Sequence, residues 1–395
     1  MNDIVKKHDQ ELMKQQNIKL VLSVIKDKGP ISRAQISRIV DMSPTSVGRI
    51  VESLMLAGLV KEVGSAKSAK NGIGRKANLL EVDAKSLLGI GVEIDKDYLG
   101  AGIIDFKGNI LKKLEYNKDL THFSPEYAAS EVVSMVNNLL SYAQKDNRKV
   151  VGIGIGIPGL VDIDKGEMVF SAQLKWKKVK IRDIIQKEFE SLTVTVDNEM
   201  KARALAESLY GMAKDSRRAA LMSVGSGVGA ALLINNKIYR GNSNNAGEIG
   251  HITIDPNGLL CECGRFGCLQ TYIADWALMK EARKFRDISS LDELFNAYRE
   301  NEQWARSIIS RAIDYIGVAI GSLVCVYNPD TVILCGRVLK NYPETAKLVM
   351  ERYKDFVWEP LQDTFKLEFS QLGEDAAIIG AGALAFVTGL DKYML

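Results

Sequence analysis

The 395-residue chain contains little of what marks secreted or membrane proteins. It has only five cysteines, and no apolar run reaches the roughly 18 residues of a membrane-spanning helix without a charge or a glycine. Its first residues, MNDIVKKHDQELMKQQ, are polar and lack the apolar stretch of a signal peptide. We therefore expect a cytoplasmic protein with no membrane span.

The few cysteines are unevenly spread, since Cys261, Cys263 and Cys268 fall within eight positions. In a cytoplasmic chain such crowding favours a metal site over disulfides. With His251, these residues offer one imidazole and three thiols, which suit a tetrahedral Zn²⁺ with no open position. We expect a structural zinc site on His251, Cys261, Cys263 and Cys268. The alternative is a loop whose cysteines bind nothing.

Charge is also unevenly distributed. Residues 1–80 contain 14 Lys and Arg against 7 Asp and Glu, a net charge of +7, so the rest of the chain carries −4 to give the total of +3. A basic small module attached to an acidic large one indicates nucleic-acid binding at one end. A solvated basic face would produce the same count, so the charge needs support from motifs.

The N-terminal pattern predicts short helices. Apolar residues recur at helical spacing over residues 17–28, and Gly29-Pro30 ends that helix. Ser32 and Gln35 predict a capping box for the next helix. Its apolar face is predicted to comprise Ile36, Ile39 and Val40.

A third helix follows the turn Asp41-Met42. Ser43 is typical of an N-cap and Pro44 of the first helical position. Val47, Ile50, Val51 and Leu54 are predicted to be buried, which leaves short polar groups and one guanidinium on the opposite face. Such a helix fits a major groove. We expect Ser43, Thr45, Ser46 and Arg49 to contact DNA.

Two predicted strands, residues 59–63 and 79–82, flank the polar segment GSAKSAKNGIGRK and form a wing. Gly72 and Gly74 permit close approach, and Arg75 and Lys76 are placed to meet phosphates or a minor groove. The order of helices, the caps and the basic wing predict a winged helix-turn-helix that binds double-stranded DNA. The alternative is a small helical protein-interaction domain.

From about residue 86 the chain becomes a series of glycine-punctuated apolar strands alternating with helices, an α/β pattern. Its most specific motifs are GEIGH (247–251) and CECGRFGC (261–268). Supporting motifs are GIGIGIPGLVD (152–162), VDNE (196–199) and SVGSGVG (223–229). On these motifs the body resembles the ROK family of bacterial sugar kinases and repressors. With the N-terminal module, the resemblance covers the whole chain, as in the xylose-type and N-acetylglucosamine-type repressors of that family.

The resemblance implies an α/β, two-lobed body with the actin-like ATPase fold. We expect the winged helix-turn-helix over residues 1–82 and the first lobe over 83–197. A C-terminal helix, 377–395, is expected to return to the first lobe. The second lobe, 198–376, carries the zinc motif and sugar-binding residues.

The resemblance also implies a monosaccharide pocket, which needs carboxylates and amides to pair with hydroxyls. The family usually has Glu after the last zinc cysteine, where this chain has the uncharged Gln270, which leaves the effector preference open. His251 is expected to reach a hydroxyl while also binding zinc, and the alternative for Glu248 is a surface carboxylate. The implied sugar-binding residues are Pro158, Gly159, Asn198, Glu199, Glu248, His251 and Gln270.

Kinase chemistry is not expected. Glu199 stands where the family's kinases carry an Asp general base, and its longer side chain shifts the carboxylate. The kinase phosphate loop, Asp-x-Gly-Gly-Thr, is replaced by residues 93–97, with Asp95 and Asp97 expected near the phosphates. The second glycine loop, 225–229, persists, and we interpret it as a tight hairpin.

We therefore expect a sugar-responsive transcriptional repressor of carbohydrate-utilisation genes without catalytic activity. It would bind a palindromic operator as a homodimer or higher oligomer, and a monosaccharide between the lobes would release it. Xylose or glucose is the first expectation for the effector. The alternatives are an ATP-dependent ROK sugar kinase and a regulator worked by a protein partner such as a transport component.

Overall fold

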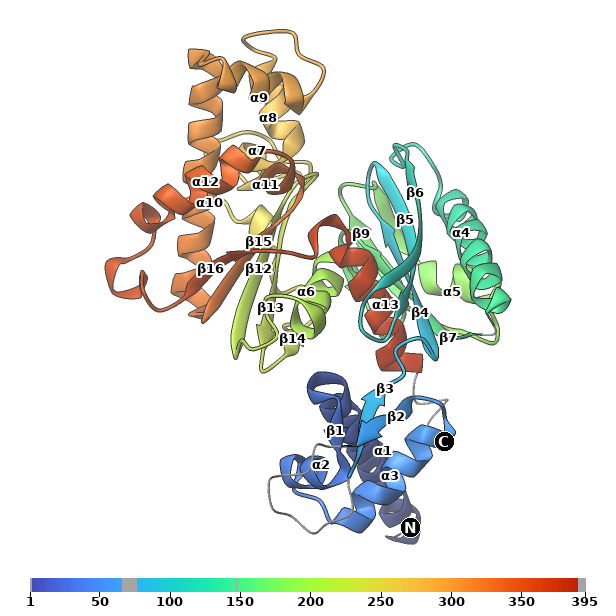
Figure 1. The fold of residues 1–395 in the computed structure, drawn as a ribbon. Helices are drawn as coiled ribbons and strands as arrows, with labels where there is room; N and C mark the ends of the chain where they lie inside the picture. The colour runs from blue at the N-terminus through green and yellow to red at the C-terminus, as the bar shows by residue number, and fades with distance from the viewer. Residues whose placement is uncertain (1, 66–76, 147, 390–395) are drawn as a thin grey trace.

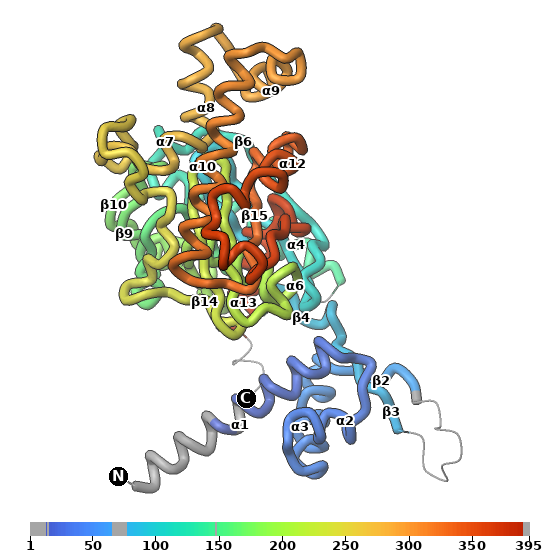
Figure 2. Tube along the Cα trace, turned by 90° about the vertical axis from the view of Figure 1, so that its left-hand side faces the viewer, coloured from blue at the N-terminus to red at the C-terminus, as the bar shows by residue number. Residues whose placement is uncertain are grey.

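The computed structural model describes residues 2–65, 77–146 and 148–389. Three parts follow one another along the chain: an N-terminal module and two lobes, each lobe built on a five-stranded sheet. Figure 1 shows the lobes side by side above the N-terminal module. From the side, the module projects from one end of the body (Figure 2).

The N-terminal module is a three-helix unit with a small sheet of order β1-β3-β2. Ser32 and Gln35 form the predicted capping box of α2, and Ser43 caps α3, so both sequence predictions are confirmed. Ile39 was predicted on the buried face and is 47% exposed, whereas Ile36 is buried and Val40 packs partly buried against the same core. The elements are α1 (Asn2–Lys28), β1 (Ile31–Ser32), α2 (Arg33–Val40), α3 (Pro44–Leu56), β2 (Val60–Ser65) and β3 (Asn78–Val82).

The first lobe contains a mixed sheet of order β11-β7-β4-β5-β6. Helices α4 and α5 pack against it, and α13 packs against β4 and β7. A smaller sheet of order β10-β9-β8 continues the lobe. Its elements are β4 (Leu87–Ile94), β5 (Tyr98–Asp105), β6 (Ile110–Asn117), α4 (Pro125–Lys145), β7 (Lys149–Ile157), β8 (Leu160–Asp162), β9 (Glu167–Ser171), β10 (Trp176–Val179), α5 (Ile181–Gln186), β11 (Thr193–Asn198) and α13 (Ala376–Gly389).

Glycines in β4 and β7 allow α13 to approach the sheet closely. A Cβ on Gly91 would come within 1.9 Å of the Ile378 carbonyl oxygen, and one on Gly154 within 1.8 Å of the Ala381 oxygen. Backbone cannot yield to such an overlap, so only glycine permits this packing. Helix packing therefore explains Gly91 and Gly154 of the strand motifs.

The second lobe repeats the arrangement with a sheet of order β14-β13-β12-β15-β16. Helix α6 packs on β13 and also on α13. The elements are α6 (Glu199–Tyr210), β12 (Arg218–Val224), β13 (Val228–Ile234), β14 (Lys237–Tyr239), α7 (Gln270–Ile273), α8 (Asp275–Ala282), α9 (Leu291–Arg299), α10 (Gln303–Tyr327), β15 (Thr331–Cys335), α11 (Arg337–Asn341), α12 (Pro343–Arg352) and β16 (Lys366–Phe369), with short 3₁₀ turns at Ile249–His251, Tyr353–Phe356, Glu359–Leu361 and Gly373–Asp375.

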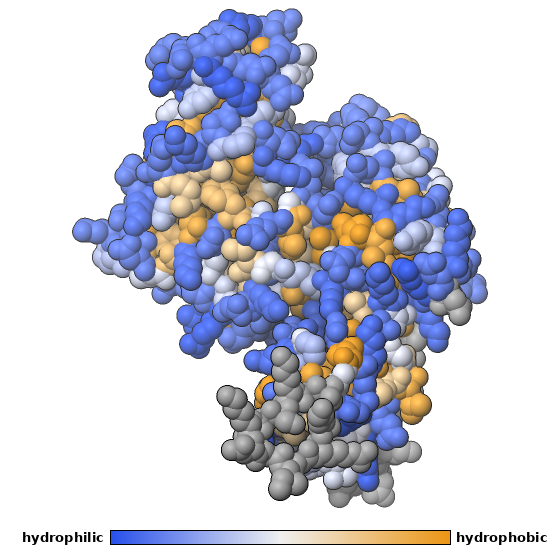
Figure 3. Space-filling model, in the orientation of Figure 1, coloured by the Kyte–Doolittle hydropathy of each residue, from blue (hydrophilic) through white to orange (hydrophobic). Residues whose placement is uncertain are grey.

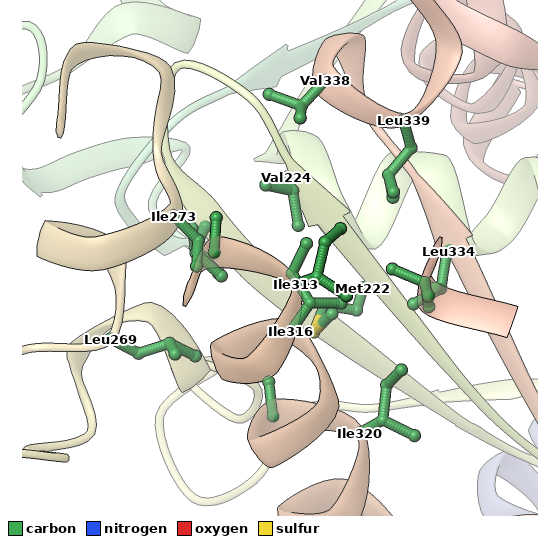
Figure 4. Close-up of a cluster of buried hydrophobic side chains, with 14 of the residues drawn as sticks. Met222, Val224, Leu269, Ile273, Ile313, Ile316, Ile320, Leu334, Val338 and Leu339 are labelled. Atoms are coloured by element: carbon green, nitrogen blue, oxygen red, sulfur yellow. The ribbon is translucent and has the colours of Figure 1, made fainter. Parts of the chain in front are cut away.

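Helix α10 is the central core helix of the second lobe. Figure 4 shows Ile313, Ile316 and Ile320 of α10 facing Met222 of β12. By length and composition α10 alone among the described helices could cross a membrane, but 61% of its most apolar window is buried inside the protein. Its apolar character is therefore explained by the core. The neighbouring tip around α8 and α9 is hydrophilic (Figure 3).

Candidate functional site

Helix α3 exposes a small polar face. Thr45, Ser46 and Arg49 are exposed, and the surroundings of Gly48 are open. Ser43 is exposed as well, but its hydroxyl oxygen accepts the backbone N–H of Ser46 at 3.1 Å and so caps the helix. An exposed helix with short side chains and one guanidinium is a surface that a major groove can accommodate.

The wing begins as a regular hairpin. Strands β2 and β3 are antiparallel and pair from Val60–Val82 to Ser65–Asn78. The predicted basic tip, with Gly72, Gly74, Arg75 and Lys76, lies outside the described residues. Among the described residues, the candidate DNA-binding surface therefore lies on α3.

A cavity of about 310 Å³ lies between the two lobes. Its size suits a small polar molecule. The polypeptide reaches it at strand ends and helix starts, after β7, at the end of β11, and at the start of α6 and α7. The cavity brings together all seven residues that sequence analysis assigned to the sugar: Pro158, Gly159, Asn198, Glu199, Glu248, His251 and Gln270.

Asn198 organises one wall of the cavity. Its side-chain oxygen accepts the backbone N–H groups of Met200 and Lys201 and so caps α6. Its side-chain nitrogen donates to the Gly159 carbonyl at 3.0 Å and to the Glu199 carboxylate at 2.9 Å. Asn198 therefore fixes the positions of both neighbours and of the helix that begins beside them.

Two carboxylates face the cavity with perturbed acidity. Burial, assisted by the nearby charges of Asp95 and Glu248, raises the pKa of Glu199 to about 8. Burial also raises the pKa of Glu248, opposed by the charge of Lys201. Lys201 is itself only 1% exposed beneath the cavity. Groups of this kind, desolvated in a concave site, mark candidate ligand-binding positions.

Ion pairs that sequence analysis did not identify join the lobes beside the cavity. Arg240 of the second lobe donates to both carboxylate oxygens of Asp197, at 2.7 and 3.1 Å. Asn244 adds bonds to Asp197 and to the Val161 carbonyl. Asp197 lies within the VDNE motif, but the sequence gives no sign that its partner lies 43 positions later.

The tip of the first-lobe hairpin bonds to the second lobe. Asp95 accepts a hydrogen bond from Ser226 of the second glycine loop at 3.0 Å, and Asp97 pairs with Arg337 at 3.0 Å. Arg337 also binds Asp275 at 2.9 Å, and Arg203 is paired with Glu93. The two arginines that line the cavity are therefore engaged by carboxylates.

His251, Cys261, Cys263 and Cys268 form a compact cluster. One potential ligand atom from each lies within 4.8 Å of the others. The Cys263 and Cys268 sulfurs are 3.6 Å apart, and the Cys261 sulfur is 3.8 Å from His251 Nδ1. Tetrahedral Zn²⁺ with Zn–S bonds of about 2.3 Å sets sulfurs about 3.8 Å apart. The donor set and its spacing therefore fit a metal ion.

The acidity of the cluster is consistent with a metal site. Burial and the nearby Arg265 lower the pKa of His251, which keeps its imidazole neutral as a ligand must be. Burial, together with hydrogen bonding to Cys263, raises the pKa of the Cys268 thiol. A bound dication reverses this effect and deprotonates the thiols.

The cluster and the cavity share a wall. Gln270, which is 4% exposed, lines the cavity and donates its side-chain N–H to the Cys261 sulfur at 3.3 Å. His251 belongs to both sets. A metal that fixes the cluster would therefore also fix two residues of the cavity.

Comparison with known proteins gives matches over both parts of the chain. The ROK family profile matches residues 89–387, and a winged helix-turn-helix DNA-binding profile matches residues 15–61. The xylose repressor of Bacillus subtilis (strain 168) is 29% identical over 387 residues, covering 98% of this chain and 99% of that protein.

Two solved structures share the fold. A ROK family transcriptional regulator, a homologue of the E. coli MLC protein, has a TM-score of 0.82 at 24% identity and covers 97% of this chain and 99% of its own. A ROK family glucokinase from Streptomyces griseus, solved with glucose and AMPPNP, has a TM-score of 0.66 at 24% identity and covers 75% of this chain and 98% of its own. The kinase likeness is confined to the fold of the body, whereas the regulator matches the chain from end to end.

Proposed function

The chain belongs to the ROK family, and on that premise we propose that it is a sugar-responsive DNA-binding repressor. A monosaccharide would bind in the cavity between the lobes and release the winged helix-turn-helix from its operator. The observation that carries the proposal is helix α6, which begins at the cavity and ends against the N-terminal module. It supplies a physical connection between the two sites.

The first residue of α6, Glu199, lines the cavity. Asn198 and Glu199 form the helix start, and both are candidate ligands for hydroxyls. A hydroxyl that displaces the bond between Asn198 and Glu199 would change how the Asn198 side chain is held, and the oxygen of that side chain caps α6. Sugar binding would thus act on the orientation of this helix.

The last residue of α6, Tyr210, contacts the N-terminal module. The Lys26 ammonium of α1 lies 4.5 Å from the ring centre of Tyr210 and 5.7 Å from that of Phe106. Lys214, just after α6, pairs with Asp27 at 3.8 Å. A helix of 12 residues is about 18 Å long, so a small tilt at the cavity moves this contact.

The N-terminal module is also joined to the first lobe through apolar contacts. Ile104, Val151 and Phe386 of the lobe belong to the same buried cluster as the helices of the module. Interlobe closure would therefore move α6 relative to a module held by the first lobe. Packed interfaces of this kind shift between discrete arrangements, which is how a small ligand changes a distant site.

The arrangement on DNA follows from the module. We assign Ser43, Thr45, Ser46 and Arg49 of α3 to the major groove, and Arg75 and Lys76 of the wing to phosphates or the minor groove. A homodimer or higher oligomer would place two such helices on a palindromic operator, and sugar binding would change their spacing. Cytoplasmic location follows from this role.

We assign a structural Zn²⁺ to the His251 and cysteine cluster. All four ligands come from the protein, so no coordination position remains open for catalysis. The metal would rigidify the loop that carries Glu248, His251 and Gln270, and so support the sugar pocket.

The alternative, an ATP-dependent sugar kinase, is less well supported. Asp95 and Asp97 occupy the tip where polyphosphate would need backbone N–H groups, and Arg203 and Arg337 are neutralised by carboxylates. Phosphoryl transfer depends on positioning and on charge stabilisation at this point. The Bacillus subtilis relative is named a repressor, and the kinase likeness extends only to the fold.

The first test is a thermal-shift screen of the full chain against monosaccharides, beginning with D-xylose and D-glucose. A sugar at 100 times its Kd should add about 2.7 kcal/mol to stability. Glu248→Ala should lose this response, whereas Glu190→Ala, at an exposed carboxylate outside the cavity, should keep it. A parallel ADP assay with the same sugar should show no turnover, and turnover of about 1–10³ s⁻¹ would establish a kinase instead.

A further inference from the structure

Gln173 lines the cavity but belongs to no motif that the sequence analysis recognised. It lies in the turn between β9 and β10 of the first lobe, and Figure 1 shows β9 on the side of that lobe that faces the second. The side-chain oxygen of Gln173 is buried and has no hydrogen-bond partner among the described residues. A buried oxygen left unpaired is unfavourable, so an unpaired carbonyl in this cavity calls for an explanation.

The turn holds Gln173 rigidly. The backbone N–H of Leu174 donates to the Ser171 hydroxyl oxygen at 3.2 Å, and Leu174 is fully buried in the first-lobe core. Ser171 also packs against Gly159 of the cavity wall, where a Cβ would come within 3.0 Å of the Ser171 Cβ. Gln173 is therefore presented on a fixed support beside the residues assigned to the sugar.

The other end of the amide contacts the opposite lobe. A Cβ built on Gly227 would lie 2.1 Å from the Gln173 side-chain nitrogen, so this nitrogen packs directly on the second glycine loop. The same loop holds Ser226, which binds Asp95 of the first lobe. Gln173 thus spans the cleft at the place where the lobes already touch.

We propose that Gln173 is a specificity-determining residue whose carbonyl oxygen accepts a hydrogen bond from one hydroxyl of the bound sugar. The inference rests on the proposed function and names the Gln173 side-chain oxygen as the acceptor that distinguishes one particular hydroxyl. A site built to bond a hydroxyl discriminates against a ligand that lacks it, because the buried acceptor is then left unpaired. Since the amide nitrogen packs on Gly227, the same bond would draw the sugar against the interlobe contact.

The test combines a variant with deoxy sugars in a thermodynamic cycle. Calorimetry on the full chain gives Kd values for D-glucose, D-xylose and their monodeoxy and deoxyfluoro analogues, with wild type and Gln173→Met. We expect Gln173→Met to raise the Kd of the best sugar about 2–10-fold, the loss of one hydrogen bond. One analogue, which lacks the hydroxyl that Gln173 binds, should bind wild type more weakly than the parent sugar by the same factor. With Gln173→Met, this analogue and the parent sugar should have equal Kd values.

Two controls separate this role from a structural one. Gln144→Met, at an exposed position of α4, should leave every Kd unchanged. Without sugar, Gln173→Met should melt at the same temperature as wild type or higher, because it removes an unpaired buried oxygen.

The outcomes distinguish this inference from the proposed function. If wild type binds no sugar of the panel, the proposed function fails and this inference with it. If wild type binds a sugar but Gln173→Met binds it equally well, or loses the same factor for every analogue, the proposed function stands and the role of Gln173 is overturned.

Discussion

At the scale of single residues, the cavity keeps groups in states that water would not favour. Glu199 retains its proton to an unusually high pH because burial and two neighbouring carboxylates oppose its charge. As a neutral carboxylic acid, such a group can donate its O–H to a sugar oxygen at neutral pH. Its burial costs free energy at a position that we assign to the sugar.

Glu199 therefore makes stability depend on pH. The unfolded carboxyl ionises near 4.5 and the folded one near 8, so in that window the unfolded state binds fewer protons and stability falls as pH rises. Glu199→Gln stays neutral, and its stability relative to wild type should grow from pH 5 to pH 8 by on the order of 1–3 kcal/mol. Urea unfolding at four pH values measures this. A difference that does not change with pH, or an equal change in the control Glu190→Gln, would count against the assignment.

The metal cluster gives a second prediction at this scale. Cys263→Ser should lose the metal and lower the melting temperature, because a structural zinc contributes to folding. Cys325→Ser is a matched control, since Cys325 is exposed and lies outside the cluster. Metal analysis should find about one zinc per wild-type chain, by the four-ligand count. Metal-free protein with undiminished stability and sugar response would refute the site.

Arg49 is the third residue whose role can be measured. Arg49→Ala should weaken binding to a preferred duplex by about 1–3 kcal/mol and relax sequence preference, if it contacts a base. Arg306→Ala, an exposed arginine of the second lobe, should bind as wild type does. Anisotropy titrations at several salt concentrations provide the comparison. Unchanged affinity and preference in Arg49→Ala would remove α3 from the interface.

At the scale of elements, local signals could be predicted from the sequence and distant contacts could not. The caps at Ser32 and Ser43 were predicted because the interacting residues are three positions apart. Helical periodicity suggested that Ile39 is buried, but which part of a stripe is covered depends on how neighbouring helices dock. The start of α1 at Asn2, well before the predicted residue 17, had no apolar signal.

The same distinction applies to the site. The motifs predicted a set of residues that does line one cavity, because family motifs record which segments form the pocket. Gln173, Arg203 and Arg240 were missed, since each acts through a partner far away in the sequence. The contact of Lys26 with Tyr210 joins residues of different modules and leaves no local pattern.

That contact yields a prediction about α6 as an element. Lys26→Met should preserve sugar affinity and DNA affinity, but reduce the factor by which sugar weakens DNA binding by about 2–30-fold. The control is Lys28→Met, because Lys28 is exposed and is the last residue of α1. The coupling factor comes from DNA titrations with and without saturating sugar. An unchanged factor would show that α6 does not carry the signal.

At the scale of the whole molecule, the body has a two-lobed fold that it shares with ROK family regulators and kinases of known structure. Carboxylates of the first hairpin bind Ser226 and Arg337 of the second lobe. The lobes are thereby held together by protein groups, and the cleft retains a ligand cavity. The N-terminal module packs on the first lobe and also contacts α6. A movement between the lobes would therefore change the contacts of the module.

The most direct test measures DNA binding by the full chain as a function of sugar. Duplexes that it prefers are first selected from a random library, and their affinity is then followed by fluorescence anisotropy across a panel of monosaccharides. We predict that at least one sugar lowers the affinity of wild type about tenfold or more, within the usual range of allosteric coupling, and that Glu248→Ala binds the same duplex without responding. A chain that binds all duplexes alike, or whose binding no monosaccharide changes, would contradict the account.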